Sequence, residues 1–192
     1  MVSSTDTVDL IIKSSTEFYN DLKADDNGRY RSWEHCYSHF IEARGSKEVD
    51  YDYLSLQLAF YLASWGMYRG SSFLLQKDYK VHIPVVKEQE LKNQLSFTLI
   101  TKILMGTLGC VPAYDRYFIA GIRNQKVATG NYNLKSILQL VDFYDKNADK
   151  FECVRGKMEV AGMPYPQMKM LDMAFWQVGF ELNINKGINT AH

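Results

Sequence analysis

Residues 54–67 read LSLQLAFYLASWGM, and this stretch decides the fold. Ten of its fourteen residues are apolar, and the exceptions are Ser55, Gln57, Ser64 and Gly66. The apolar residues do not alternate with polar ones, so the stretch does not fit a half-buried strand. A helix that is apolar on nearly every side is typical of the centre of a bundle. We therefore predict an all-α fold whose other helices pack around this one.

The size and charge of the chain narrow its class. A chain of 192 residues is most simply one domain, spanning residues 1–192. Lys and Arg balance Asp and Glu at 22 each, which gives no general argument for a nucleic-acid partner. The longest fully apolar run, residues 58–63, is far shorter than the ~18 residues of a membrane span, so we expect no membrane partner.

The cysteines and the first residues indicate a compartment. Three cysteines are widely spaced, their number is odd and no CxxC pair occurs. This usage is typical of reduced thiols in the cytoplasm. The segment MVSSTDTVD has no basic stretch followed by an apolar one, so it does not resemble a signal peptide. We expect a cytoplasmic protein.

Helical spacing and end signals predict seven or eight helices. Ser32 and Ser96 are the expected caps of two of them. The helix that begins at Leu134 is expected to bury Leu134, Ile137, Leu138, Val141 and Tyr144. Residues 81–86 fit either a strand or a kinked helix, and the helix is favoured; residues 151–163 are expected to be irregular, with a short hairpin. The predicted helices cover residues 5–23, 32–45, 50–67, 71–79, 96–109, 112–122, 134–144 and 166–182.

A polar line runs along the predicted central helix. Gln57, Tyr61, Ser64 and Tyr68 are spaced by four, three and four residues and therefore lie on one face. Such a line on an apolar helix requires partners. It lines a pocket or forms an internal hydrogen-bond ladder, and the ladder is the favoured interpretation.

An anion site is a second hypothesis. Arg69-Gly70-Ser71-Ser72 joins the end of the central helix to the next helix, whose free N–H groups favour an anion. The GxxxxGK[ST] spacing of a P-loop is absent. In the alternative interpretation, Arg69 pairs with an internal carboxylate, and Ser71 or Ser72 only caps the helix.

A metal site is the third hypothesis. His35, His39 and Glu42 share a helical face at i, i+4 and i+7, which is a usable metal spacing. A further ligand would have to come from a distant residue such as His82. Two histidines on a solvated face are the commoner situation, so we expect neither a metal nor a cofactor.

The fourth candidate is Asp115, in the stretch GCVPAYDRYF at residues 109–118. This turn resembles the one that carries the catalytic aspartate in helix-hairpin-helix DNA glycosylases, which are all-helical and have an aromatic base pocket. The resemblance covers about ten residues, and it implies a catalytic role for Asp115. The LPGxG hairpin of that family is absent upstream, where residues 93–102 read NQLSFTLITK. The blocks SWEHCY and LASWGMYRGSSFLLQKDY also resemble bacterial hypothetical proteins without a known activity.

Three functional hypotheses follow. The leading one is a helical binding module with a cleft for a small anionic or aromatic ligand. The second is an enzyme, either a base-processing one that uses Asp115 or a metal-dependent one that uses His35 and His39. The third is a homo-oligomeric interaction protein, with the Met-rich residues 158–173 as its contact surface. The expected cleft residues are Glu34, Tyr61, Trp65, Tyr68, Arg69, Ser71, Ser72 and Lys102. Whether Glu34, Arg69, Lys102, Asp115 and Asp172 converge on one cleft is a question for the structure.

Overall fold

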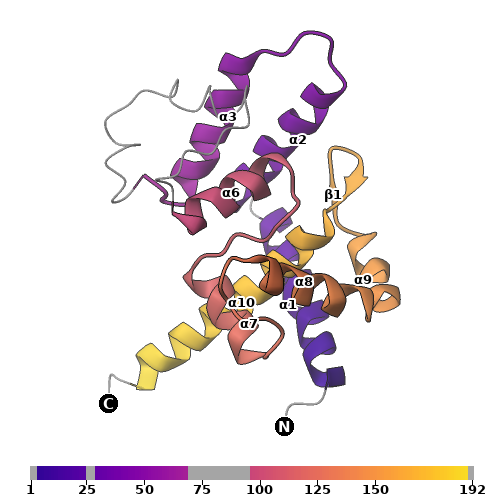
Figure 1. Cartoon of the computed structure of the whole chain (residues 1–192), viewed down its shortest axis with the longest axis vertical. Helices are drawn as coiled ribbons and strands as arrows, with labels where there is room; N and C mark the ends of the chain where they lie inside the picture. The colour runs from indigo at the N-terminus through magenta and orange to yellow at the C-terminus, as the bar shows by residue number, and fades with distance from the viewer. Residues whose placement is uncertain (1–3, 25–28, 69–95, 190–192) are drawn as a thin grey trace.

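The fold is all-α, as predicted. The computed structural model describes residues 4–24, 29–68 and 96–189 (Figure 1). Within these residues there are eight α-helices, one 3-10 turn (η1, Arg29–Arg31) and a two-stranded antiparallel hairpin. The expected helix at 71–79 and the ambiguous residues 81–86 lie outside the described residues. The elements are α1 (Ser4–Ala24), α2 (Ser32–Arg44), α3 (Tyr51–Ser64), α6 (Phe97–Thr107), α7 (Arg116–Asn124), α8 (Leu134–Asp145), α9 (Ala148–Arg155), β1 (Glu159–Val160), β2 (Met163–Pro164) and α10 (Gln167–Asn189).

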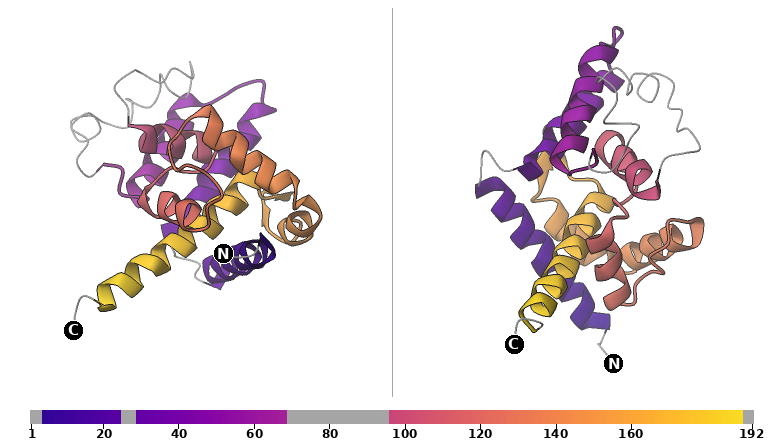
Figure 2. Two further views of the ribbon diagram at one scale, coloured as in Figure 1. Left: turned by 60° about the horizontal axis from the view of Figure 1, so that its bottom comes forward. Right: turned by 90° about the vertical axis from the view of Figure 1, so that its left-hand side faces the viewer.

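Helix α10 holds the central position. Its sequence is apolar nearly all round, and Met170, Leu171, Met173 and Phe175 are fully buried. The helix packs mainly against α1 and α7, which Figure 2 shows on either side of it. Because both faces are covered, α10 buries the all-round apolar surface that its sequence carries.

Helix α3 is peripheral rather than central. It packs mainly against α2 and α6, at one end of the molecule (Figure 1). Leu58 and Leu62 face the core, whereas the Phe60 side chain is 64% exposed and Leu56 is also exposed. Of the two helices expected at the centre, α10 occupies it and α3 does not. An all-round apolar composition does not by itself specify how many faces a helix buries.

The buried face of α8 differs from the predicted one. Leu134 is 71% exposed and Leu138 is 55% exposed, so the prediction that both are buried is wrong. Tyr144 is buried as predicted, together with Ser136 and Leu140, which were not in the predicted stripe. The Ser136 hydroxyl lies 2.9 Å from the buried Tyr114 hydroxyl, so this inward-facing polar side chain has a hydrogen-bond partner.

Helix starts were predicted with mixed success. Ser96 caps α6 and accepts a hydrogen bond from Leu99 N at 3.2 Å, as expected. Ser32 is not a cap: it is the first residue of α2, and Arg31 holds the capping position without a side-chain bond. Helix α7 begins at Arg116 rather than Pro112, because Asp115 caps it. The expected hairpin is present and spans residues 159–164. Helix α9 covers residues 151–155, which were expected to be irregular.

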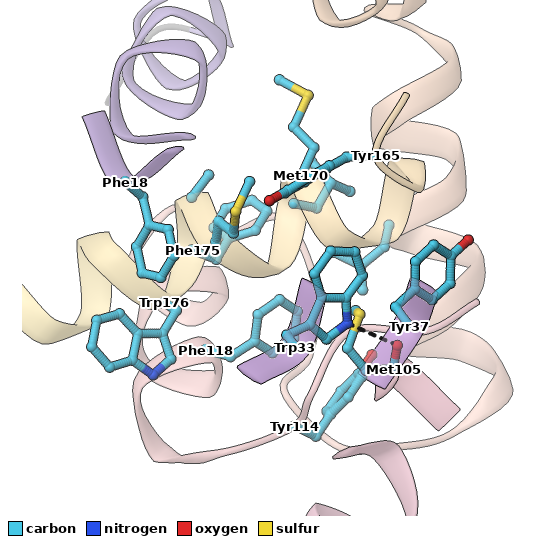
Figure 3. Packing of buried hydrophobic residues seen from close by; sticks show 14 of the residues in the cluster. Phe18, Trp33, Tyr37, Met105, Tyr114, Phe118, Tyr165, Met170, Phe175 and Trp176 are labelled. Atoms are coloured by element: carbon cyan, nitrogen blue, oxygen red, sulfur yellow. Dashed lines mark hydrogen bonds between the residues drawn. The ribbon is translucent and has the colours of Figure 1, made fainter. Parts of the chain in front are cut away.

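The core is rich in aromatic side chains, several of which Figure 3 shows packed close together. Trp33 of α2 donates from Nε1 to the Met105 carbonyl oxygen of α6 at 3.0 Å. On α10, the Trp176 ring lies 5.8 Å from that of Phe18 in α1 and 5.2 Å from that of Tyr117 in α7, in edge-to-face geometry. The ring contacts hold α1, α7 and α10 together, and the Trp33 hydrogen bond holds α2 against α6.

Candidate functional site

A cavity of about 230 Å³ lies where the end of α3 meets α6, α7 and α10. Three aromatic side chains line it: Trp65, Tyr117 and Trp176. Its polar residues include Lys102 of α6 and Asp115 at the start of α7. We name it the Trp65 pocket. Its lining residues are Ser64, Trp65, Gly66, Met67, Thr98, Lys102, Asp115, Arg116, Tyr117 and Trp176.

Lys102 is the buried cation of this pocket, with an exposed fraction of only 3%. Its Nζ lies 3.0 Å from Asp115 Oδ2. The same Nζ lies 4.3 Å from the centroid of the Trp65 ring, within cation–π range. A buried charge is tolerated when it is paired, and both contacts offset the loss of water around the ammonium group.

Both carboxylate oxygens of Asp115 accept hydrogen bonds. Its Oδ1 accepts the N–H groups of Tyr117 at 3.0 Å and Phe118 at 3.1 Å, so it caps α7. Its Oδ2 accepts from Lys102. Three hydrogen bonds thereby hold the carboxylate in one orientation. Its negative charge also interacts favourably with the positive end of the α7 dipole. A fixed carboxylate beside a fixed ammonium group is a suitable geometry for recognition or for proton transfer.

The loop before Asp115 is held from two helices. Gly109 turns the chain at φ +64°, where an added Cβ would lie 2.5 Å from the Pro166 ring. Thr101 of α6 accepts the Tyr114 N–H at 2.9 Å. Asp172 of α10 accepts the Ala113 N–H at 2.8 Å. The position of Asp115 therefore depends on side chains outside its own helix.

A second buried ion pair lies next to the pocket. Lys169 Nζ is 3.1 Å from Asp172 Oδ2, and both residues are buried on α10. The Lys169 ammonium lies 4.8 Å from the Trp33 ring centroid and 5.9 Å from that of Trp65. Burial lowers the pKa of Lys169, and the neighbouring Asp172 carboxylate opposes that shift. Two ammonium groups thus lie near the Trp65 ring.

Sequence reasoning did not select Lys169. The signal was present, because Lys169 and Asp172 interrupt an otherwise apolar helix at i and i+3. Lys and Asp are almost never fully buried unless paired, so this spacing indicates an internal ion pair.

Glu34 belongs to a different network. Its Oε1 accepts from Lys23 Nζ at 2.7 Å and from the Tyr165 hydroxyl. Burial, together with the hydrogen bond to Glu34, raises the pKa of Tyr165. This cluster joins α1, α2 and Tyr165, which lies between β2 and α10. Glu34 does not line the Trp65 pocket.

Ser64 is the member of the α3 polar line that lines the Trp65 pocket. Ser64 donates to the Phe60 carbonyl oxygen of its own helix at 2.9 Å. Tyr61 is buried behind Trp65, with ring centroids 6.5 Å apart, and does not line the pocket. Burial and the carboxylates of Asp172 and Asp115 raise its pKa. Tyr68 is half-buried, and burial raises its pKa as well.

The residues of the anion-site and metal-site hypotheses lie away from the Trp65 pocket or outside the described residues. Arg69, Ser71, Ser72 and His82 lie outside the described residues. His35 is exposed.

His39 is engaged through both ring nitrogens: Nε2 lies 3.1 Å from the Tyr53 hydroxyl and Nδ1 lies 3.5 Å from Glu42 Oε2. In the described part of the chain, no group of three or more His, Cys, Asp or Glu is arranged to hold a metal ion.

Comparison of the chain with known protein families, with curated proteins and with solved structures gave no match. None of the helices in residues 4–24, 29–68 and 96–189 combines the length and the apolar character needed to cross a membrane.

Proposed function

We propose that the chain binds a small planar ligand in the Trp65 pocket. Aromatic rings of Trp65, Tyr117 and Trp176 supply flat apolar surfaces, which suit a ring that stacks or packs edge-on. Lys102 and Asp115 supply a donor and an acceptor for the polar edge of that ring. This combination of apolar walls and a few fixed polar groups is typical of ligand sites.

The size and charge of the pocket suggest the ligand class. A cavity of about 230 Å³ is smaller than the roughly 300–1,000 Å³ of sites for drug-sized molecules, which favours one or two fused rings. Lys102 has three donors, and one of them goes to Asp115. Arg116 at the rim adds a second cation, with its guanidinium 4.4 Å from the Tyr117 ring centroid. An aromatic ring with an anionic or acceptor edge fits these groups.

One observation carries the proposal: a buried Lys–Asp pair lines a cavity between aromatic rings instead of being fully enclosed. The test uses a panel of purine and pyrimidine bases, benzoate and indole-3-carboxylate, read by thermal shift and by tryptophan fluorescence. The double variant Lys102→Met/Asp115→Asn removes the pair without leaving an unpaired charge. The exposed pair Lys146–Asp142, 2.7 Å apart, provides the matched control Lys146→Met/Asp142→Asn.

We expect at least one panel compound to raise the melting temperature of the wild type and of the control variant. The same compound should have no effect on the Lys102→Met/Asp115→Asn variant. The proposal fails if no compound shifts the wild type, or if the pocket variant binds as well as the control.

A second candidate function is an enzyme that acts on a nucleobase. The specific observation is the direct contact of the Lys102 amine with the Asp115 carboxylate beside the aromatic pocket. A lysine amine, once deprotonated, is a nucleophile towards carbonyl carbons, and a carboxylate accepts or returns protons. Enzymes that process bases also hold the extruded base against aromatic side chains.

This candidate is tested on duplexes that contain uracil, 8-oxoguanine or an abasic site. Strand cleavage by the wild type, lost in Asp115→Asn and in Lys102→Met, would support it. Borohydride trapping on the abasic duplex would report an imine with Lys102. Equal results for the wild type and both variants would remove this candidate and leave the binding proposal standing.

A further inference from the structure

A short chain of hydrogen bonds connects α10 to Asp115. Asp172 Oδ1 accepts the N–H of Ala113 at 2.8 Å. The carbonyl oxygen of Ala113 in turn accepts the N–H of Asp115 at 2.7 Å. One residue, Ala113, therefore lies between the Asp172 carboxylate and the backbone N–H of Asp115.

The Asp172 carboxylate is itself fixed. Its second oxygen, Oδ2, accepts from Lys169 Nζ at 3.1 Å. Lys169 is only 2% exposed and lies under the Trp33 ring, so the ion pair is enclosed by the core. A buried carboxylate with both oxygens engaged has one stable orientation.

Helix α6 holds the neighbouring peptide. Thr101 accepts the Tyr114 N–H at 2.9 Å, and the next residue along α6 is Lys102. Two successive N–H groups of the loop are thus bound by different helices, Ala113 by α10 and Tyr114 by α6. The α10 anchor comes from the neighbour of Lys169, whereas the α6 anchor, Thr101, precedes Lys102 in the chain.

We infer that Asp172 is a positioning residue for the Trp65 pocket: through its hydrogen bond to Ala113 it sets where Asp115 meets Lys102. Its effect on ligand binding rests on the proposed function above. Its effect on the geometry of the Lys102–Asp115 pair does not, and can be measured without a ligand.

The test compares two double variants with equal charge. Removing Asp172 alone would leave Lys169 buried and unpaired, and that loss can prevent folding. Lys169→Met/Asp172→Asn and Lys169→Met/Asp172→Leu both remove the ion pair, but only Asn keeps an acceptor for the Ala113 N–H. Amide hydrogen exchange at Ala113 and Asp115 and the Lys102 ammonium resonance are followed by NMR, with Leu140 of α8 as the reference for global stability.

We expect the Leu variant to exchange at Ala113 and Asp115 at least about tenfold faster than the Asn variant, relative to Leu140, because one buried hydrogen bond is lost. The Lys102 resonance should move in the Leu variant and stay near its wild-type position in the Asn variant. Equal exchange and an equal Lys102 resonance in the two variants would overturn the inference. A wild type that binds no panel compound contradicts the proposed function and leaves this outcome unaffected.

Discussion

Gly121 of α7 and Gly179 of α10 face each other where the two helices cross. A Cβ added to Gly179 would lie 3.0 Å from the Gly121 nitrogen and 1.9 Å from the Tyr117 carbonyl oxygen. A Cβ added to Gly121 would lie 2.0 Å from the Phe175 carbonyl oxygen. The helices therefore touch backbone to backbone, and only hydrogen atoms fit between them.

This contact makes a strong prediction for alanine at either position. In an open helix, Gly→Ala stabilises by up to about 1 kcal/mol. Here the methyl group meets backbone that cannot turn aside, so we expect Gly121→Ala and Gly179→Ala each to lower the free energy of unfolding by about 1–3 kcal/mol or more. Urea unfolding of each variant measures this change in the free energy of unfolding. The control is Gly45→Ala, whose Cβ would meet only the Glu42 oxygen, at 4.0 Å; stability losses equal to this control would refute the close crossing.

Leucine truncations test the inward face of α8. Leu140 is fully buried, whereas Leu138 on the same helix is mostly exposed. We expect Leu140→Ala to cost about 2–5 kcal/mol and Leu138→Ala less than about 0.5 kcal/mol. Chemical denaturation of the two variants measures both losses in the free energy of unfolding. A larger loss for Leu138→Ala would restore the face predicted from the sequence.

Acid stability should depend on Glu152. Hydrogen bonds from Arg155, then Gln167 and Tyr144, lower the pKa of Glu152 to about 2 from its ordinary 4.5. A lowered pKa means that this stabilisation is present above pH 4.5 and is lost as the pH falls towards 2. Glu152→Gln should flatten that part of the pH–stability curve, by less than about 1 kcal/mol because the side chain is 38% exposed. The exposed Glu17, 3.8 Å from Lys13, supplies the control Glu17→Gln, which should leave the curve as it is.

Thiol reactivity should separate the three cysteines. Cys36 is buried and burial raises its pKa, whereas Cys110 and Cys153 are exposed. Although Cys110 is exposed, desolvation by the surrounding protein raises the pKa of its thiol. A smaller fraction of Cys110 is therefore thiolate than for an ordinary thiol. We expect a colorimetric disulfide reagent to label Cys153 first, Cys110 more slowly, and Cys36 only after denaturation. Single Cys→Ser variants assign the phases, and rapid labelling of native Cys36 would contradict its place in the core.

The sequence predicted the existence of most elements better than their burial. Periodic apolar residues located α1, a stretch that is apolar nearly all round located α10, and Ser96 marked the start of α6. The burial of Leu140 rather than Leu138 was missed because leucines lie on two sides of α8, and the Tyr114–Ser136 hydrogen bond on the buried side is a tertiary contact. Secondary-structure periodicity carries no information about such a contact.

The candidate site was predictable in part. Trp65 and Lys102 were both expected in the ligand cleft, whereas Asp115 was singled out under the separate enzyme hypothesis. The path of residues 108–115 brings Lys102 to Asp115, and that path depends on Asp172 of α10. Trp176 and Tyr117 enter the pocket only through the crossing of α10 and α7, so helical spacing alone did not identify them.

The packing of α1 along α10 also has a consequence during translation. Phe18 of α1 meets Trp176 of α10 with ring centroids 5.8 Å apart, although one helix is Ser4–Ala24 and the other Gln167–Asn189. At roughly 5–20 residues per second, on the order of ten seconds pass on the ribosome between the synthesis of the two helices. Throughout that interval the apolar stripe of α1 lacks its native cover, and it is buried only after α10 has been made.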